Sequence, residues 1–572
     1  MRHRSVSASL ILGLFATLAP TAAAQLGSHP GVDVSLGILG PELAYQGRTG
    51  AAGSGFVGMS MATTSCNPGT INVPWRQAMD LRHPFIAFMA VRELNGRLYQ
   101  ISDRSYVKHG FYALSSSQCT PCTYPSDGTW LGIGCSDTYS TGNNGSNYSL
   151  APPDEIDPWT GVWAKNCSLF DRGFPTLPPP QDCDGVESQR FPPSGAGWRV
   201  RIADSELIGG GSYWYSAAYV IPSWTQTSVG SNGQPCPQPG GNPTGLLNEP
   251  DANRTNNIAS RPMSVTFNGL NGLAGFSTTG SQQQGTVLQR WSGASVDSGK
   301  NGDADGRVYV AVKVTGPVQG VWHYEYAAHN RDNGGGIKSF RVPVCGSARV
   351  LNAGFHDTDV PINAGNDWTF AVQGGEITWT APTGNSLRWN GLYNFWFDSD
   401  AGPAAANVAL HQDLLLRGAA VSFAVPSQAP IGLYNMYLGA GCGTPTAPTL
   451  MATGSPARAT IGNATFGLES FGNAVGAGCM LYASAVDGTM SLPPCSIYLG
   501  PNLNAAIPLM ITAANASGRA AYALPIPNDS ALEGMSVNFQ HIEAQVGGSL
   551  LGVVDLSNGL RVRMGNLLNG CP

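Results

Sequence analysis

The residue types best suited to bind a transition metal lie in one short stretch near the middle of the sequence. His323, Glu325 and His329 occupy alternate positions, so on a β-strand their side chains point to the same face. Imidazole and carboxylate groups are ligands for zinc and similar ions, which makes His323 and Glu325 a candidate metal site. His329 lies roughly 20 Å from His323 along a strand and is too distant to share the ion. We favour a simpler interpretation, a solvent-exposed strand face opposite the apolar Tyr324 and Tyr326.

A second candidate is a calcium-binding loop at residues 301–307. Asn301, Asp303 and Asp305 place oxygen atoms at alternate positions and are followed by a glycine, which is how calcium loops begin. A complete loop carries an acidic residue at its twelfth position, where Val312 stands. We therefore favour a structural turn between two strands, with calcium as the alternative, and we expect no other cofactor.

The chain contains an even number of cysteines. They are Cys66, Cys119, Cys122, Cys135, Cys167, Cys183, Cys236, Cys345, Cys442, Cys479, Cys495 and Cys571. In an exported chain such a set is typical of disulfide bonds, and spacing alone does not determine the pairing. The Cys119–Cys122 motif could be redox-active, or could bind zinc with Cys135. We favour structural disulfides for the whole set.

Support for catalysis is weak. Neither a G-x-S-x-G nucleophile elbow nor an H-E-x-x-H zinc motif occurs. The acidic side chains between Asp154 and Asp157 could act as the acid and base of glycoside cleavage, although a solvated loop is the favoured interpretation. His83, Lys108 and His109 lie in a region expected to be rich in irregular loops, where functional sites often occur.

A dense group of aromatic residues follows at 389–397. It contains Trp389, Tyr393, Phe395, Trp396 and Phe397. Aromatic faces serve both hydrophobic cores and sugar stacking. We favour core packing for this group, with a sugar-binding platform as the alternative.

The N-terminus has the three-part layout of a secretory signal peptide. Two arginines precede an apolar run at 9–16, and small residues at 22–24 come before Gln25. The apolar run is too short to span a bilayer, and no later stretch reaches the roughly 18 apolar residues of a membrane helix. We therefore expect a signal peptide at residues 1–24 and a mature chain without a transmembrane segment.

The composition favours an all-β protein with many turns. Glycine accounts for 74 of 572 residues and proline for 41, which disfavours long helices, while 51 aromatic residues (13 Trp, 19 Tyr, 19 Phe) argue against disorder. Short β-branched and aromatic runs alternate with turn residues, and Asn95-Gly96 predicts a tight hairpin. The net charge of -6, without a basic cluster, argues against nucleic-acid binding.

Changes in these patterns predict the domain organisation. Residues 25–190 are predicted to form an irregular, disulfide-rich N-terminal domain. Residues 198–425 are predicted to form one large β-sandwich or two. A Gly/Pro connector at 430–445 precedes a small C-terminal sandwich at 446–570. The predicted fold class is therefore all-β and multi-domain, built from β-sandwich modules.

Several stretches of the sequence resemble a known group of proteins. They are HYEYAAHN at 323–330 with SFRVP at 339–343, AGFHD at 353–357, and LRWNGLYNFWFD at 387–398. Together they resemble a group of uncharacterised secreted proteins of planctomycetes and other environmental bacteria. The segment that ends at 556–560 resembles a terminal module of such proteins. The resemblance implies export and β-sandwich modules, and it implies no particular activity.

Two functions remain open at the level of sequence. The favoured hypothesis is a non-catalytic protein, secreted, periplasmic or on the cell surface, that acts through adhesion, matrix structure or contact with a glycan or cell-surface component. The alternative is a secreted hydrolase acting on an extracellular polymer, with its site within 26–190 or at an interface between sandwiches. Convergence of His83, His109 and a carboxylate in one concave pocket would favour the enzyme.

The signal peptide can be tested directly. Mass spectrometry of the exported protein should find a mature chain that begins at Gln25, because the small residues at 22–24 suit a signal peptidase. A leader that remains attached to protein isolated from inside cells would contradict export by this route.

Overall fold

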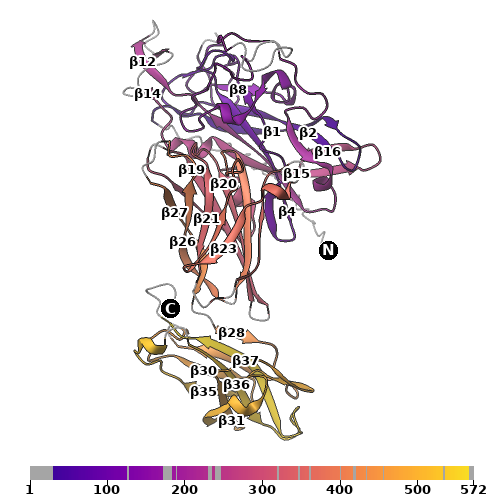
Figure 1. Cartoon of the computed structure of the whole chain (residues 1–572), viewed down its shortest axis with the longest axis vertical. Helices are drawn as coiled ribbons and strands as arrows, with labels where there is room; N and C mark the ends of the chain where they lie inside the picture. The colour runs from indigo at the N-terminus through magenta and orange to yellow at the C-terminus, as the bar shows by residue number, and fades with distance from the viewer. Residues whose placement is uncertain are drawn as a thin grey trace, which may run out of the picture.

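The computed structural model describes the greater part of the chain. The described residues are 30–124, 128–171, 183–188, 190–229, 235–238, 246–303, 305–318, 321–344, 348, 350–359, 363–399, 401–416, 420–432, 435–454, 457–532 and 535–565. Within these ranges antiparallel strands form three β-sandwiches, so the predicted all-β, multi-domain fold class is confirmed. Figure 1 shows the first two sandwiches packed together and the third, in yellow, below them. No helix in the described part is long and apolar enough to cross a membrane.

The first sandwich consists of a four-stranded sheet and an eight-stranded sheet. The smaller sheet contains β1 (Ser35–Thr49), β2 (Phe56–Cys66), β8 (Ser136–Tyr139) and β10 (Val200–Ala203). The larger sheet contains β4 (Phe85–Leu94), β5 (Arg97–Gln100), β6 (Val107–His109), β9 (Leu150–Ala151), β11 (Ser212–Val220), β15 (Ile258–Asn268), β16 (Leu273–Thr278) and β17 (Gln283–Gln284). Between the sheets lies a buried core, to which Leu36 and Val57 contribute from one side and Ile86, Phe88 and Tyr215 from the other.

Short accessory elements surround this sandwich. The accessory strands are β3 (Val73–Pro74), β7 (Trp130–Leu131), β12 (Trp224–Val229), β13 (Pro235–Gln238) and β14 (Leu246–Leu247). Helical structure in the described ranges of the whole chain is limited to α1 (Thr141–Asn144) and to the 3-10 turns η1 (Asn147–Ser149), η2 (Pro153–Glu155), η3 (Asp204–Leu207), η4 (Asn253–Asn256), η5 (Val287–Arg290), η6 (Ala364–Asn366), η7 (Leu503–Ala505) and η8 (Ser530–Leu532).

Strand pairing joins the two sides of the predicted boundary at 190–198. β10 pairs with β2, and β11 pairs with β4 along its whole length. The segment up to β17 therefore belongs to the same sandwich as the predicted N-terminal domain, and the boundary falls inside that sandwich.

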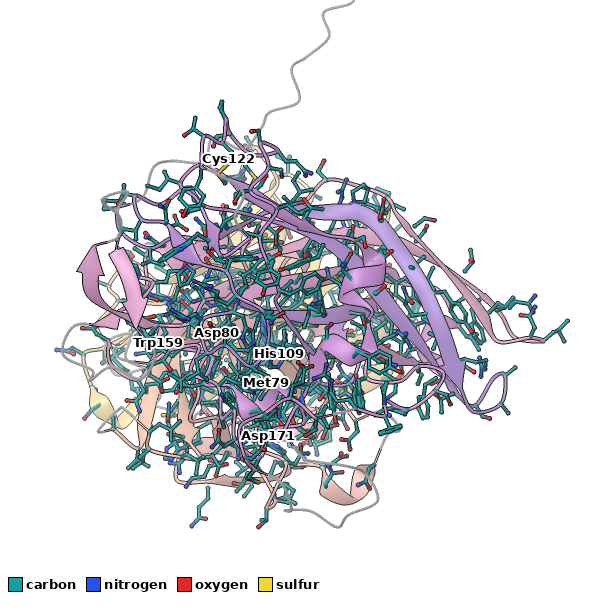
Figure 2. All side chains as sticks on the ribbon, turned by 90° about the horizontal axis from the view of Figure 1, so that it is seen from above. Met79, Asp80, His109, Cys122, Trp159 and Asp171 are labelled. Atoms are coloured by element: carbon teal, nitrogen blue, oxygen red, sulfur yellow. A yellow bond between two sulfur atoms is a disulfide. The ribbon has the colours of Figure 1, made fainter. Side chains whose placement is uncertain are left out.

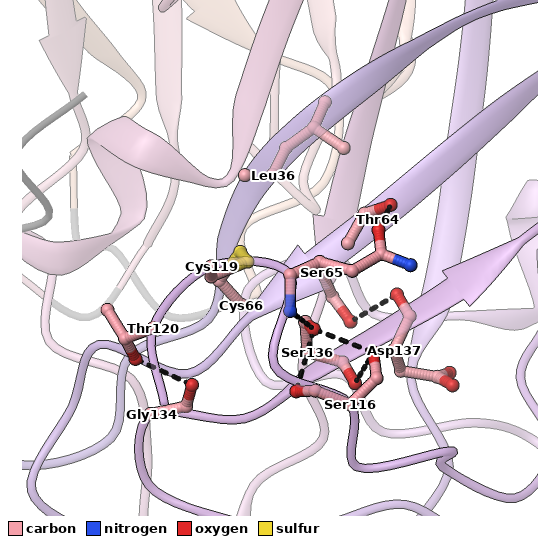
Figure 3. Close-up of a disulfide and its surroundings, with 12 residues drawn as sticks. Leu36, Thr64, Ser65, Cys66, Ser116, Cys119, Thr120, Gly134, Ser136 and Asp137 are labelled. Atoms are coloured by element: carbon pink, nitrogen blue, oxygen red, sulfur yellow. Dashed lines mark hydrogen bonds between the residues drawn. A yellow bond between two sulfur atoms is a disulfide. The ribbon is translucent and has the colours of Figure 1, made fainter. Parts of the chain in front are cut away.

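Four disulfides are present in the described residues. They join Cys66 to Cys119, Cys122 to Cys135, Cys167 to Cys183 and Cys442 to Cys495. The two cysteines of the C-x-x-C motif thus pair with different partners, as expected for structural disulfides rather than a redox pair. Figure 3 shows the Cys66–Cys119 bond beside the hydrogen bonds between Ser116 and Ser136.

The remaining cysteines depart from the expectation or lie outside the description. Cys479 is a free thiol buried in the core of the third sandwich, so the prediction that all cysteines form disulfides is wrong at this position. Its side chain packs as a small apolar group, as buried free cysteines do. Cys345 and Cys571 lie outside the described residues, as does the side chain of Cys236.

The second sandwich consists of two five-stranded sheets. One contains β18 (Ser295–Lys300), β19 (Arg307–Val318), β20 (Val321–Asn330), β22 (Val350–His356) and β25 (Gly391–Ser399). The other contains β21 (Ile337–Pro343), β23 (Thr369–Gln373), β24 (Glu376–Thr380), β26 (Gly402–Gln412) and β27 (Ser422–Gly432). The core between them is aromatic, and the rings of Phe340 and Phe395 stack with centroids 4.4 Å apart.

The aromatic group at 389–397 mostly serves hydrophobic packing. Tyr393, Phe395 and Phe397 point into the core of the second sandwich. Trp389 is buried in a separate cluster against the first sandwich, and Trp396 is only partly buried. Core packing, the favoured interpretation, therefore holds for the four buried rings.

The third sandwich begins earlier than predicted. Its larger sheet contains β28 (Asn435–Leu438), β31 (Gly478–Ser484), β34 (Ile507–Ala513), β36 (Ser536–Ala544) and β37 (Val554–Arg563). Its other strands are β29 (Thr449–Thr453), β30 (Gly467–Phe471), β35 (Arg519–Ala523) and the hairpin β32 (Met490–Leu492) with β33 (Cys495–Ile497). Because β28 pairs with β37, the predicted connector at 430–445 contributes a strand to this sandwich.

The first and second sandwiches share an apolar interface. Along β4, Ile86 and Phe88 enter the first core, whereas Met89 and Val91 on the opposite face join a buried cluster that includes Leu392 of β25. The larger sheet of the first sandwich is therefore buried on both faces over this region.

Polar groups in the interface are paired across it. The amide of Asn394 donates to the carbonyl of Leu98 at 2.9 Å, and the backbone N–H of Leu392 donates to the side chain of Gln100 at 2.9 Å. Buried backbone groups that lose contact with water need such partners. The two sandwiches are thus joined by specific hydrogen bonds as well as by apolar contact.

Truncation at the interface should destabilise both sandwiches. Leu392 is fully buried, so Leu392→Ala should lower the free energy of unfolding by about 2–5 kcal/mol in denaturant titrations. Leu351 of β22 is 45% exposed, and Leu351→Ala should have little effect. Equal effects of the two substitutions would show that the interface is not closely packed.

Candidate functional site

A pocket opens at the rim of the interface between the first two sandwiches. Its volume is about 450 Å³, which is within the range of ligand-binding pockets, and domain interfaces are a preferred location for them. The first sandwich contributes β5, the turn before it and η3, while β20 and β22 come from the second. The lining residues are Leu94, Asn95, Arg97, Tyr99, Glu206, His323, Glu325 and His356.

A tight hairpin positions the residues from the first sandwich. Asn95 and Gly96 both have positive φ values, 53° and 87°, as a two-residue turn of this type requires. The turn sends β5 back along β4. On β5, Arg97 and Tyr99 point toward the pocket, while Leu98 between them packs into the apolar interface. The alternation of a strand thus separates pocket residues from interface residues.

A chain of charged groups crosses the pocket floor. Arg97 makes two hydrogen bonds to Glu325, at 2.6 and 2.9 Å. Glu325 Oε2 lies 3.2 Å from His323 Nε2, and His323 Nδ1 lies 2.7 Å from Asp398 Oδ1. The Arg97 guanidinium also stacks 3.4 Å above the ring of Trp396, a cation–π arrangement.

The predicted pairing of His323 with Glu325 is present, and both groups have other partners. Each ring nitrogen of His323 contacts a carboxylate, and each oxygen of Glu325 bonds to Arg97. The described part of the chain contains no group of three or more His, Cys, Asp or Glu side chains arranged to hold a metal ion. The geometry is that of an ion-pair chain.

The favoured interpretation of this strand face as solvent-exposed is wrong. Ala327 and His329, on the same face, are buried against the first sandwich, and His329 Nδ1 lies 2.8 Å from Thr286 Oγ1. This face combines polar and small apolar residues because it packs against the first sandwich, and the sequence of β20 alone does not show that partner.

The two histidines of the pocket differ in their electrostatic surroundings. The hydrogen bond to Glu325 raises the pKa of His323, and Asp398 adds to the rise, against the opposing effect of burial. Burial lowers the pKa of His356, and the Arg97 cation adds to the fall while the Glu206 carboxylate opposes it. His356 packs edge-to-face against Tyr99, with ring centroids 5.1 Å apart.

Tyr99 connects the β4–β5 hairpin to η3 through a hydrogen bond to Glu206. Its hydroxyl donates to Glu206 at 2.8 Å, and Arg92 contacts the same carboxylate oxygen at 3.3 Å. Burial, together with the neighbouring Glu206 charge, raises the pKa of the Tyr99 hydroxyl. The phenol is therefore fixed as a hydrogen-bond donor.

Sequence reasoning found only the part of this pocket that lies on β20. Arg97, Tyr99, Glu206 and His356 come from three other segments, and no local motif links them. One available signal was the unbroken apolar run at 85–91, which is typical of a strand buried on both faces. That signal predicts a second layer over the sheet, and with it an interface.

The candidate calcium loop does not gather its oxygen ligands. The Asn301 amide donates to the carbonyl of Ala420 at 2.9 Å, and Asp303 is fully exposed beside Lys300. Asp305 is buried and accepts from the amide of Asn333 at 2.8 Å. The loop connects the paired strands β18 and β19, and its three candidate ligands face different partners.

His83 and His109 converge, but inside the core. His83 Nε2 lies 2.8 Å from His109 Nδ1, and the two side chains are 0% and 1% exposed. Phe85, Trp163 and Phe170 pack around them. Figure 2, viewed from above, shows His109 near the middle of the molecule and Cys122 at its periphery. The pair is sealed from solvent rather than exposed in a concave pocket.

Burial controls the charge of this cluster. It lowers the pKa of His83 to about 4, that of His109 well below its ordinary value, and that of Lys108 to about 7. The carboxylate of the nearby Asp80 bonds to Arg82 instead of to either imidazole. No carboxylate completes a catalytic arrangement with the histidine pair within the described residues.

The acidic residues at 154–157 organise the local backbone. Glu155 accepts from the N–H of Leu169 at 2.8 Å, and Asp157 accepts from the N–H of Trp159 at 2.9 Å. Asp154 forms an ion pair with Arg104. These contacts are those of structural turns.

Comparisons with known proteins give little support to any family. No family model matches the chain, and no curated protein matches it. Among solved structures, BcpA, the major pilin subunit of Bacillus cereus, is similar at 10% identity and a TM-score of 0.19, over 68% of this chain and 90% of the pilin; a variant of that pilin gives the same values. A Salmonella alpha-2-macroglobulin reacted with methylamine gives 8% identity and a TM-score of 0.12, over 92% of this chain and 33% of that one. These scores carry no argument, and the resemblance to secreted bacterial proteins stays a prediction.

The opposite shifts of the two pocket histidines can be measured by NMR titration of their imidazoles. We expect His323 to titrate above 6.5 and His356 below it. Because the folded-state pKa of His323 is raised, its stabilising effect is present below pH 6.5 and is lost as the pH rises through that pKa. Asp398→Asn should lower the pKa of His323 and leave that of His356 in place. A His323 that titrates below 6.5 would contradict the ion-pair chain.

Proposed function

We propose that the protein is a non-catalytic exported protein of the cell surface or extracellular space, which acts by binding. The observation that supports this proposal most directly is the placement of the side chains that could act in catalysis. The histidine pair of the first sandwich is sealed in its core, and the acidic residues of the loop at 154–157 bond to backbone or to arginine. The carboxylates of the pocket, Glu206 and Glu325, each contact a guanidinium.

The disulfides support a location outside the reducing cytosol. Such bonds form and persist in oxidising compartments, and four are present among the described residues. Three of them lie in the first sandwich, where long loops between short strands leave much of the chain outside regular sheets. Covalent links of this kind suit a domain that must stay folded outside the cytosol.

The architecture suits a binding site that keeps a fixed geometry. The pocket is built mainly on strands of two sandwiches joined by an apolar interface, and sites on such elements are held more firmly than sites on loops. A fixed surface with polar groups suits adhesion to a glycan or another cell-surface component. The third sandwich extends the molecule beyond this rigid pair (Figure 1).

Two measurements on the full chain test this proposal. Protease treatment of intact producing cells should remove the protein, because it lies outside the cytoplasm. Purified protein should sediment with an insoluble polysaccharide without releasing reducing ends over many hours. Release of reducing ends would instead support the hydrolase, and protection of the protein inside intact cells would overturn the proposed location.

A further inference from the structure

We propose that the pocket at the rim of the first two sandwiches binds a neutral saccharide through Arg97, Glu206 and His356. This inference rests on the proposed binding function and assigns it a site and a ligand class.

The first argument is the hydrogen-bonding capacity that remains in the pocket. Arg97 uses Nε and one terminal nitrogen on Glu325, and its other terminal nitrogen has no partner among the described residues. Glu206 uses Oε2 on Tyr99 and Arg92, and its Oε1 is unoccupied by described residues. Donor and acceptor atoms therefore remain at the surface of the pocket.

His356 supplies both kinds of group. The structure shows no hydrogen bond from described residues to either ring nitrogen, and the ring is half-buried beside Tyr99. Burial lowers its pKa, so at neutral pH the imidazole offers one donor and one acceptor. Neighbouring hydroxyl groups of a sugar each donate and accept, and they complement such a set.

The second argument is the charge balance. Arg92 pairs with Glu206 and Arg97 with Glu325, while His323 lies between the carboxylates of Glu325 and Asp398. Both carboxylates that line the pocket are therefore paired with a guanidinium group, so the lining offers no unpaired carboxylate to a strongly basic ligand and no unpaired guanidinium to a strongly acidic one. A polar but uncharged ligand therefore loses the least hydration free energy when it enters the pocket.

The third argument is the shape and chemistry of the walls. Tyr99, His356 and Arg97 line the pocket; the rings of Tyr99 and His356 meet edge-to-face, and the Arg97 plane stacks on Trp396. Flat groups that carry polar atoms at their edges suit the mixed apolar and hydroxylated faces of a sugar ring. The volume of about 450 Å³ leaves room for a short saccharide.

Binding of the full-length mature protein to an array of neutral gluco-, manno- and chito-oligosaccharides tests the site, with calorimetry on the best binder. His356→Ala and Glu206→Gln should each weaken binding about tenfold or more, as loss of a hydrogen bond to a charged or buried group does. Glu206→Gln keeps an oxygen for Tyr99, which limits damage to the fold.

Ser264→Ala provides the matched control. Ser264 lines another pocket of the first sandwich, of about 460 Å³, and its substitution should leave saccharide binding unchanged. Equal melting temperatures of the three variants would show that lost binding does not reflect unfolding.

The outcomes separate this inference from the proposed function. A surface protein that adheres to polysaccharide equally well with and without the pocket substitutions would overturn the site and leave the function in place. Saccharide cleavage that depends on Glu206 would support the site and overturn the non-catalytic function. Binding of no member of the neutral array, or stronger binding of polygalacturonate measured beside that array, would overturn the ligand class.

Discussion

The structure depends on one constraint, the burial of a single sheet on both of its faces. β4 carries apolar residues at every position from Phe85 to Val91. Alternate side chains enter the first core on one face, and on the other face they join two further buried clusters. Exposure of either face to water would leave a large apolar surface unburied, at a cost of roughly 25 cal/mol per Å². The second sandwich covers the part of the other face that carries Met89 and Val91. This requirement fixes the two sandwiches relative to each other.

The same constraint explains why charges pair at the rim of the interface. Along one face of β20, Ala327 is fully buried, the side chain of Glu325 is 5% exposed and that of His323 is 40% exposed. The strand thus leaves the apolar interface and reaches solvent within four residues. A carboxylate at the inner end of this gradient loses much of its hydration, and only direct pairing offsets that loss. Arg97 of the first sandwich provides this pairing. The pocket lies at the Arg97–Glu325 pair, where the interface reaches solvent.

Sequence predicted the local features well, because these features depend on neighbours in the chain. The fold class, the Asn95-Gly96 turn and the shared face of His323 and Glu325 all follow from spacings of a few residues. The partner of Glu325 is 228 positions away, on β5. The pairing of β10 with β2 likewise crosses more than a hundred residues and removes the predicted boundary at 190–198. Contacts between residues so far apart in the sequence result from the packing of whole sheets. The hydrophobic periodicity of a single segment does not predict them.

The histidines in the core and the histidine at the pocket show how packing distinguishes a structural role from a binding role. His83 and His109 are surrounded by aromatic rings, and desolvation keeps the pair uncharged near neutral pH. The pair has no contact with solvent through which it could exchange protons. The 2.8 Å distance between its ring nitrogens therefore reflects packing and hydrogen bonding. His356 is also partly desolvated, yet it lines a pocket, and its ring nitrogens have no hydrogen-bond partner among the described residues. Access to solvent, rather than convergence of reactive residue types, therefore identifies which of the two places a ligand can reach.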